Sequence, residues 1–287
     1  MTQLANLSEI RSLVDRGAIF YVGHSGGKDS QAMYAAVRKV VPDHQVRVVH
    51  ADLGDIEHAG IKDFIRANID HELIIANAIF ADGSPKDFFG AVRARRATLD
   101  RNGQFDAPAF PSSASRFCTS DLKTGPVWKA IKADGDHDLV VNCVGIRAEE
   151  SKARAKKIKN RGTLNLNKKN TNGKRDAYDW WPIADWLIDD VWAEILGAGQ
   201  WPHEAYGFDG TTATDNDRLS CVFCIFGSVK DLRHGARLRP DLLEKYDELE
   251  RDVRSTMFHG QTLKERIGIE IEVNPAPVGA LQMEFAI

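Results

Sequence analysis

The stretch from Ile19 to Ser30 constrains the fold of this chain more than any other part of the sequence. It opens with four apolar residues, which predict a short buried strand, and residues 31–37 follow with a helical composition. A polar turn that contains two glycines separates the two elements. A strand, a tight turn and a helix N-terminus point backbone N–H groups and the positive end of the helix dipole toward one place, so we expect an anion site there.

The side chains of this turn suit a phosphate group. Gly26 and Gly27 can adopt positive φ and let a phosphate approach the backbone, while Lys28 supplies a charge and Ser25 and Ser30 supply hydroxyl donors. The spacing differs from the phosphate loop of kinases and GTPases and from the Gly-x-Gly-x-x-Gly dinucleotide turn. The alternative is a glycine turn with a solvated lysine, but a six-residue motif set between a strand and a helix favours the anion site.

Further apolar runs predict a parallel sheet. Residues 46–52, 72–76 and 138–146 have the pattern of strands, and helical patterns separate them. A strand–helix–strand order implies right-handed parallel crossovers, and ligands in such sheets lie beyond the carboxyl ends of the strands. Asp52 stands at one such end, where it could face the ligand or cap the helix that we expect at 56–68.

The chain has 287 residues, which is enough for one large domain or two small ones. We predict an α/β fold in which a parallel twisted sheet of Rossmann type has helices on both faces. Residues 1–215 would form this domain and carry the anion site. Residues 216–287 would form a smaller, mostly helical region packed on it, because residues 228–255 are strongly helical in composition.

Composition excludes several classes of protein. The chain is 43% hydrophobic and 28% charged, which is ordinary for a globular protein. No apolar run reaches the roughly 18 residues needed to span a membrane. The first residues lack a basic region followed by an apolar core, so no secretory signal is visible. We therefore expect a cytoplasmic protein without membrane contact.

Residues 152–175 differ in charge from the rest of the chain. They hold ten Lys or Arg and no Asp or Glu, and removing these charges from the net −3 leaves −13 elsewhere. Several asparagines and a glycine also lie there, so we expect a mobile loop. Such a basic block on an acidic protein indicates an anionic partner. Two interpretations stay open, a loop over nucleotide phosphates and a contact with nucleic acid.

A second junction between a strand and a polar loop begins at Gly145. Arg147 follows it and can bind a phosphate or sulfate-like group through two parallel hydrogen bonds. Lys123, in the segment before the helix that ends near residue 133, could clamp the same kind of group, and Glu150 and Arg154 are weaker candidates. Several such junctions along one sheet edge would build one cleft.

Four cysteines define a second candidate site. Cysteines of an intracellular chain are more often metal ligands or catalytic than disulfide-bonded. Cys221 and Cys224 have the spacing of half a metal or cluster site, and Cys118 would join them through the fold. Cys143 lies in an apolar strand, where small buried thiols are common, although it is a possible fourth ligand. A zinc ion completed by His203 or His234 is an alternative, and a redox-inert pair is another.

The segments described so far resemble one known family. Ser25–Ser30 resembles the pyrophosphate loop of the adenine-nucleotide alpha-hydrolase superfamily, whose members are also called PP-loop ATPases. Residues 145–154 resemble a nucleotide-binding segment of the small subunit of bacterial ATP sulfurylase. The order of motifs between about 17 and 240 is similar to that of the phosphoadenosine phosphosulfate reductase family. Those motifs are Ser25–Ser30, Arg116–Pro126, Gly145–Ser151, Trp181-Pro182 with Asp190-Val191-Trp192, and the Cys221/Cys224 pair.

The resemblance implies both ligands and chemistry. It implies an adenine nucleotide, ATP or a relative, across the edge of a parallel sheet, and a [4Fe–4S] cluster on Cys118, Cys221 and Cys224. Mg²⁺ would accompany the nucleotide, and Asp29 could help hold it. Lys28, Asp29, Lys123 and Arg147 would take part in catalysis. The nucleotide would be bound by Ser25, Gly26, Gly27, Lys28, Asp29, Ser30, Asp52, Gly145, Arg147, Glu150 and Arg154.

One departure from the family pattern bears on activity. Reductases of this family carry a catalytic cysteine near the C-terminus, and this chain has none after Cys224. The pattern is closer to the reductase-like proteins of phages and mobile elements and to sulfur-transfer proteins of DNA phosphorothioation. We therefore expect adenylylation with pyrophosphate release that serves sulfur or sulfate transfer, with a sulfur donor or partner protein and possible action on nucleic acid. A sulfonucleotide reductase with an external thiol and an inactive nucleotide-binding regulator are the alternatives.

Overall fold

The fold is built on one six-stranded sheet, seen in the computed structural model, which describes residues 3–219 and 221–269. The strand order is β3-β2-β1-β4-β6-β5, and every neighbouring pair is parallel except β5 with β6. The first strand of the chain therefore lies inside the sheet, with crossovers to both sides. The strands are β1 (Ile19–Gly23), β2 (Val46–Asp52), β3 (Leu73–Asn77), β4 (Leu139–Cys143), β5 (Leu164–Leu166) and β6 (Asp176–Trp180).

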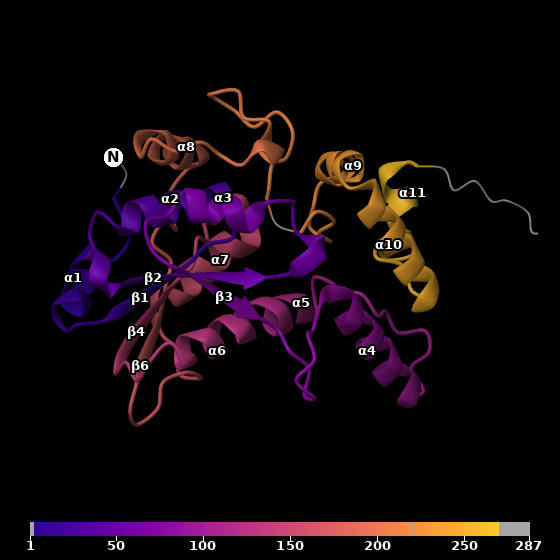
Figure 1. Cartoon of the computed structure of the whole chain (residues 1–287), viewed down its shortest axis with the longest axis horizontal. Helices are drawn as coiled ribbons and strands as arrows, with labels where there is room; N and C mark the ends of the chain where they lie inside the picture. The colour runs from indigo at the N-terminus through magenta and orange to yellow at the C-terminus, as the bar shows by residue number, and fades with distance from the viewer. Residues whose placement is uncertain (1–2, 220, 270–287) are drawn as a thin grey trace, which may run out of the picture.

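Helices cover both faces of this sheet, as the sequence predicts. Alternate residues of β1 face opposite sides, so Phe20 and Val22 join one core and Tyr21 joins another. In Figure 1, α2, α3 and α8 lie above the sheet and α6 lies below it. The helices around the sheet are α1 (Leu7–Asp15), α2 (Lys28–Val37), α3 (Ile61–Ala67), α6 (Gly125–Ala133) and α8 (Ile188–Gly197). The α/β fold class is confirmed.

A separate helical lobe has its own apolar core. Three helices near the C-terminus pack together with α4, which comes from much earlier in the chain, and Figure 1 shows them side by side at the right. Pro240 begins α10, where its missing N–H costs nothing. The lobe is built from α4 (Phe88–Arg101), α9 (Val229–Leu238), α10 (Pro240–Asp252) and α11 (Leu263–Ile267). The C-terminal part of the predicted 216–287 region, residues 270–287, lies outside the described residues.

The basic segment 152–175 contains a helix and a strand, so the prediction of a loop along its whole length is wrong. Its first half is helix α7 (Lys152–Arg161), which begins with the Ser151 hydroxyl accepting from the Arg154 amide and ends at Gly162. Its second half is β5 and the turn that leads into β6. The buried Ile158 packs with Trp181 and explains why the segment folds. One apolar contact surface is enough to order a helix whose charges stay in water.

The tryptophans at 180, 181 and 186 are buried and belong to the core. The strand β6 that carries Trp180 was not predicted, because its five residues include two aspartates and do not alternate regularly between polar and apolar. Among the described residues, no helix combines the length and the apolar composition that a membrane span requires.

Candidate functional site

The turn between β1 and α2 is closed by its own residues. Gly26 has φ of +75°, and a Cβ at this position would overlap the side chain of Ile61. The Ser30 hydroxyl accepts from the Ser25 amide at 3.1 Å and donates to the Gly27 carbonyl at 2.8 Å. Both features need the residue types that the sequence places there, so the turn has a defined shape without a ligand.

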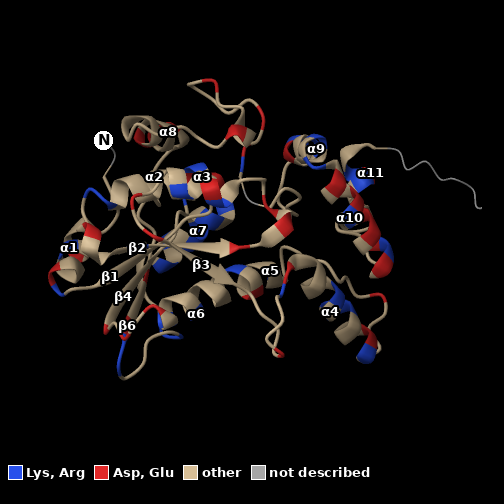
Figure 2. Ribbon diagram, viewed as in Figure 1, with Lys and Arg blue, Asp and Glu red and all other residues tan. Residues whose placement is uncertain are grey.

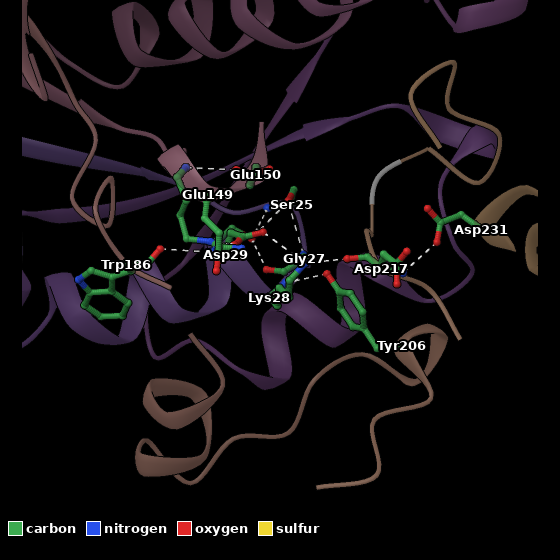
Figure 3. A network of polar contacts seen from close by, with 12 residues as sticks. Ser25, Gly27, Lys28, Asp29, Glu149, Glu150, Trp186, Tyr206, Asp217 and Asp231 are labelled. Carbon is green, nitrogen blue, oxygen red and sulfur yellow. Dashed lines mark hydrogen bonds and ion pairs between the residues drawn. The ribbon is translucent and has the colours of Figure 1, made fainter. Parts of the chain in front are cut away.

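The segment 206–219 lies over this turn. The Tyr206 hydroxyl accepts from the Lys28 amide at 2.9 Å, and a Cβ on Gly27 would lie 3.1 Å from the Leu219 carbonyl oxygen. The ammonium of Lys28 donates to the Asp217 carbonyl at 2.7 Å (Figure 3). Burial lowers the pKa of Lys28, and the nearby Asp29 opposes that shift. Lys28 therefore holds the covering segment and carries a charge at the edge of the turn.

The second predicted junction meets the first. Arg147 Nε donates to Asp29 Oδ1 at 2.6 Å, and the same guanidinium pairs with Glu149 and donates to the Trp186 carbonyl at 3.2 Å (Figure 3). A Cβ on Gly145 would lie 3.0 Å from the Asp29 carbonyl oxygen, so only a glycine fits without displacement. The structure thus brings the loop residues 25–30 together with Gly145 and Arg147.

Positive charge accumulates beside the junction. Arg154 pairs with Glu150, yet its pKa is lowered to about 10, first by burial and then by repulsion from Arg218, with Arg116 and Arg147 adding to it. Among the described residues, no carboxylate lies within ion-pair distance of Arg116 or Arg218. Asp29 attracts Arg154 from a longer distance. Cations outnumber acids here, and the excess defines a place for an anionic ligand.

Sequence reasoning missed Arg116 and Arg218 as site residues. Both lie in segments that carry the cysteines, two positions before Cys118 and three before Cys221. Arg116 is exposed, and its guanidinium lies 4.7 Å from the centre of the Phe226 ring. The sequence showed these segments, but only the fold shows that the two arginines have no carboxylate partner among the described residues. Tyr206 was missed because its contact with Lys28 joins residues far apart in the sequence.

Asp52 contacts the chain that leads into α3. Its carboxylate accepts from the Gly54 amide and from Lys62 Nζ, both at 2.9 Å. Burial tends to raise the pKa of Asp52, but these two hydrogen bonds outweigh it and lower the pKa. Asp52 does not cap the helix predicted there, because α3 begins at Ile61 with Gly60 as its N-cap and no side chain caps it; Asp52 instead accepts from the turn at Gly54 and pairs with Lys62. The ligand role of Asp52 has no contact in its favour.

Asp52 also belongs to a group that the sequence did not indicate. Ligand atoms of His50, Asp52 and Glu57 all lie within 4.8 Å of one another. They already have protein partners, since His50 Nδ1 contacts the His24 carbonyl at 2.9 Å and Glu57 accepts from the Leu53 amide at 3.1 Å. The Asp29 carboxylate, the predicted Mg²⁺ contact, is likewise taken by Arg147 and lies 3.6 Å from Lys28 Nζ. No step of the chemistry below is routed through Mg²⁺.

Three of the four cysteines form one cluster. Cys221 forms a β-bridge with Glu57, and Cys118 is the middle residue of α5 (Phe117–Thr119). Both cysteines pack against the apolar core of the helical lobe. The thiol groups of Cys118, Cys221 and Cys224 lie close enough to influence one another's charge. The three thiols also raise the pKa of Lys123, and Cys221 has the largest effect. The structure therefore places Lys123 against the thiols and not at the nucleotide loop, where the sequence predicted it.

The spacing of the three thiols differs from that of a single zinc site. A tetrahedral zinc brings its thiolates to about 3.8 Å from one another. Among the described residues, the three sulfur atoms do not form a group within 4.8 Å of one another. The histidines of the zinc alternative are engaged elsewhere: His234 Nδ1 contacts Asn216 Oδ1 at 2.7 Å, and His203 Nδ1 accepts from the Ala205 amide at 3.1 Å.

An orphaned hydroxyl faces the same cluster. Tyr246 is fully buried, and its hydroxyl has no hydrogen-bond partner among the described residues. Its ring lies 5.3 Å from that of Phe223, between the paired cysteines, and burial together with the three thiols raises its pKa. A buried hydroxyl without a partner is costly, so a group that accepts from it belongs there.

Cys143 stands apart from the other three. It is fully buried in β4, where it packs in the core of the sheet, and burial followed by the charge of Asp179 raises its pKa well above the usual range. Its thiol contacts the Val141 carbonyl at 3.9 Å. This placement is the one that the core interpretation of Cys143 predicts.

Comparison with known proteins gives little beyond the fold. No family model matches the chain, and no curated protein matches its sequence. Among solved structures, it is similar to a Candida glabrata FMN adenylyltransferase in complex with FAD and inorganic pyrophosphate, at 14% identity and a TM-score of 0.34. The likeness covers 70% of this chain and 56% of that protein, so it spans about half of its length. At this level of similarity, the class of the protein rests on its own sheet and loop.

Proposed function

We propose that this chain binds ATP, or a related adenine nucleotide, with the pyrophosphate portion on the turn between β1 and α2. The observation that carries the proposal is the excess of cations around that turn, where Arg116 and Arg218 have no carboxylate partner among the described residues and Arg218 repels the half-buried Arg154. A polyphosphate would relieve their mutual repulsion. The N-terminus of α2 at Lys28 adds the positive end of the helix dipole at the same place.

The reaction that this arrangement supports is transfer of the adenylyl group. An acceptor oxygen forms a bond to the α-phosphorus, the bond from that phosphorus to the bridging oxygen breaks, and pyrophosphate leaves with the electron pair. The proton of the acceptor passes to solvent. Charge develops on the leaving pyrophosphate, where Lys28, Arg154 and Arg218 stabilise it. Asp29 and Glu149 orient Arg147 from opposite sides, so its guanidinium is a fixed donor.

The cysteine cluster is the second part of the proposed function. Cys118, Cys221 and Cys224 would hold a [4Fe–4S] cluster, which supplies electron or sulfur transfer when bound. Three cysteines leave one iron with a non-cysteine ligand. Leu219, which contacts the turn through Gly27, is only two positions before Cys221, so the two sites are adjacent in the fold. This adjacency favours sulfur or sulfate chemistry on an adenylylated intermediate, with an external sulfur donor.

Two other functions fit the same sites. A sulfonucleotide reductase would use an external thiol, because no cysteine follows Cys224. A nucleotide-binding regulator would bind without turnover. Pyrophosphate release from ATP supports adenylylation, sulfite release from the sulfonucleotide supports the reductase, and tight binding without either product supports the regulator.

Substitution of Arg218 tests the nucleotide site directly. Arg218 is exposed and has no carboxylate partner among the described residues, so Arg218→Ala should leave the fold intact. Loss of a charged contact to phosphate, worth about 1.5–3 kcal/mol, should weaken ATP binding about tenfold or more in calorimetry. Arg237→Ala, an equally exposed arginine on α9, is the matched control. Equal affinities of both variants and the unchanged protein would reject the nucleotide site.

A further inference from the structure

The basic segment divides into two groups of cations that lie toward opposite ends of the strands. Helix α7 follows β4 at its carboxyl end, beside the nucleotide turn. Lys168, Lys169 and Lys174 lie in the turn between β5 and β6, which precedes the amino end of β6. Arg175 in that turn donates to the carbonyls of Gly135 and His137, just before β4 begins. Figure 2 shows this turn at the lower left, away from α7.

Helix α7 carries two stripes of positive charge. Arg154, Lys157 and Arg161 share its inner side: Lys157 and Arg161 lie over the Trp181 ring at 5.0 and 5.8 Å, and Arg154 faces the nucleotide site. Positions 152, 156 and 159 share another side because they follow the helical period. Their three lysines are exposed, and no described carboxylate lies within ion-pair distance of them.

Lys152, Lys156 and Lys159 form an outer stripe that a nucleotide on the turn does not need. The inner residues already serve the turn and the Trp181 contact, and a nucleotide has only two or three phosphates. The helix has ten residues and is therefore about 15 Å long. One strand of a DNA duplex carries one phosphate per about 3.4 Å of helix axis, so this length runs beside about four phosphates. A polymer of phosphates is the anion that fits a line of lysines of this length.

We propose that α7 binds a nucleic-acid strand along Lys152, Lys156 and Lys159 and directs it toward Arg154 at the nucleotide site. This inference rests on the proposed function, because it makes nucleic acid the acceptor of the chemistry beside the turn. The two groups of cations then differ in role. The lysines of α7 bind the strand, and those of the β5–β6 turn do not.

The test compares two triple variants that remove the same charge from the same segment. Lys152→Ala, Lys156→Ala and Lys159→Ala are combined in one variant, and Lys168→Ala, Lys169→Ala and Lys174→Ala in its matched control; all six side chains are exposed. Binding of labelled single-stranded DNA, duplex DNA and RNA is measured as a function of salt. The α7 variant should bind at least tenfold more weakly at low salt. Its log–log salt slope should be smaller by about 2 on a single strand and about 3 on duplex DNA.

The control variant should keep the affinity and the slope of the unchanged protein, and both variants should keep its ATP affinity. Absence of nucleic-acid binding by the unchanged protein at low salt would overturn the inference. So would equal losses in the two variants, since total charge would then explain the effect. Loss of ATP affinity in the α7 variant alone would make the helix a cover for the nucleotide. The ATP titration reports on the proposed function and the salt slope on the α7 surface, so the two can fail separately.

Discussion

The turn between β1 and α2 and the cysteine cluster both lie beside the carboxyl end of the sheet, but they differ in how far apart in the sequence their residues are. The turn closes on itself through Ser25, Gly27 and Ser30, and Tyr206 and Leu219 cover it. The cysteine cluster combines position 118 with positions 221 and 224, and a buried hydroxyl beside it has no partner. The comparison separates a turn closed by hydrogen bonds between close neighbours in the sequence from a cluster assembled from distant segments, and a buried polar atom without a partner among the described residues lies beside each, His24 Nε2 at the turn and the Tyr246 hydroxyl at the cluster.

Removal of the metal group should show the largest difference between the two sites. Protein purified without oxygen should contain iron and sulfide and absorb broadly in the visible range. Cys221→Ser should lose both, and the free energy of unfolding should fall by about 4 kcal/mol if the group was present at a thousandfold excess over its Kd. Metal analysis and urea unfolding measure these effects, and ATP affinity should change little.

Cys143→Ser is the control for that experiment, and it should retain the iron. Loss of iron in this variant would make Cys143 the fourth ligand and contradict its placement in the core. Zinc in place of iron in the unchanged protein would remove the cluster from the proposed function.

A substitution in the turn should damage the preformed site without a metal being involved. Gly26→Ala forces a side chain into positive φ and against Ile61, so we expect a loss of about 3 kcal/mol in the free energy of unfolding. Gly54→Ala is a matched control, because Gly54 has φ of +65° and no atom within 4 Å of the added Cβ. It should lose only about 1 kcal/mol. Equal losses, measured by denaturant unfolding, would mean that contact with Ile61 does not shape the turn.

Acid should weaken the turn through His24. Burial, followed by the nearby His50, lowers the pKa of His24 to about 3, and burial followed by His203 lowers that of His58 to about 4. The unfolded chain binds these protons near pH 6.5 and the folded chain does not, so stability is complete above pH 6.5 and falls as pH decreases from there toward pH 4. Each histidine contributes a slope of about 1.4 kcal/mol per pH unit.

Urea unfolding at several pH values between 7 and 4.5 measures this slope. In His24→Asn the amide oxygen can still accept from the Gly26 amide, and the slope should fall by about half. His259→Asn, at an exposed position, should keep the slope of the unchanged protein. If the free energy of unfolding depends on pH equally in His24→Asn and in the unchanged protein, His24 is not the source of this pH dependence.

The smallest effect should come from Tyr246, and its sign should depend on the metal group. In the metal-free protein, Tyr246→Phe removes an unsatisfied hydroxyl and should leave the free energy of unfolding unchanged or slightly higher. In the loaded protein it should cost about 1 kcal/mol, because a hydrogen bond to the cluster is lost. Tyr21→Phe, whose hydroxyl donates to Asp134 at 2.8 Å, should cost the same in both states. Equal effects of Tyr246→Phe in both states would mean that the hydroxyl does not face the bound group.

Much of the framework was predictable because it depends on neighbours in the sequence. The bounds of β2, the start of α10 at Pro240 and the turn after β1 all follow from apolar periods and from glycine and proline chemistry. The basic segment was not predictable in this way. Lys, Arg and Ala favour a helix at residues 152–161, but the asparagines and the glycine that follow favour a loop, and the contact that packs the segment, Ile158 with Trp181, spans more than twenty residues.

What the sequence by itself determined is the parallel sheet and the residue types at the turn, because strand period, helix capping and positive φ are local properties of the chain. The tertiary structure decided which charges face one another. It placed Lys123 against the cysteines and left Arg116 and Arg218 without carboxylate partners among the described residues. It also placed Lys156 and Lys168 toward opposite ends of the strands. Electrostatic energy depends on distance in space and on burial, and neither can be known until distant segments have packed together.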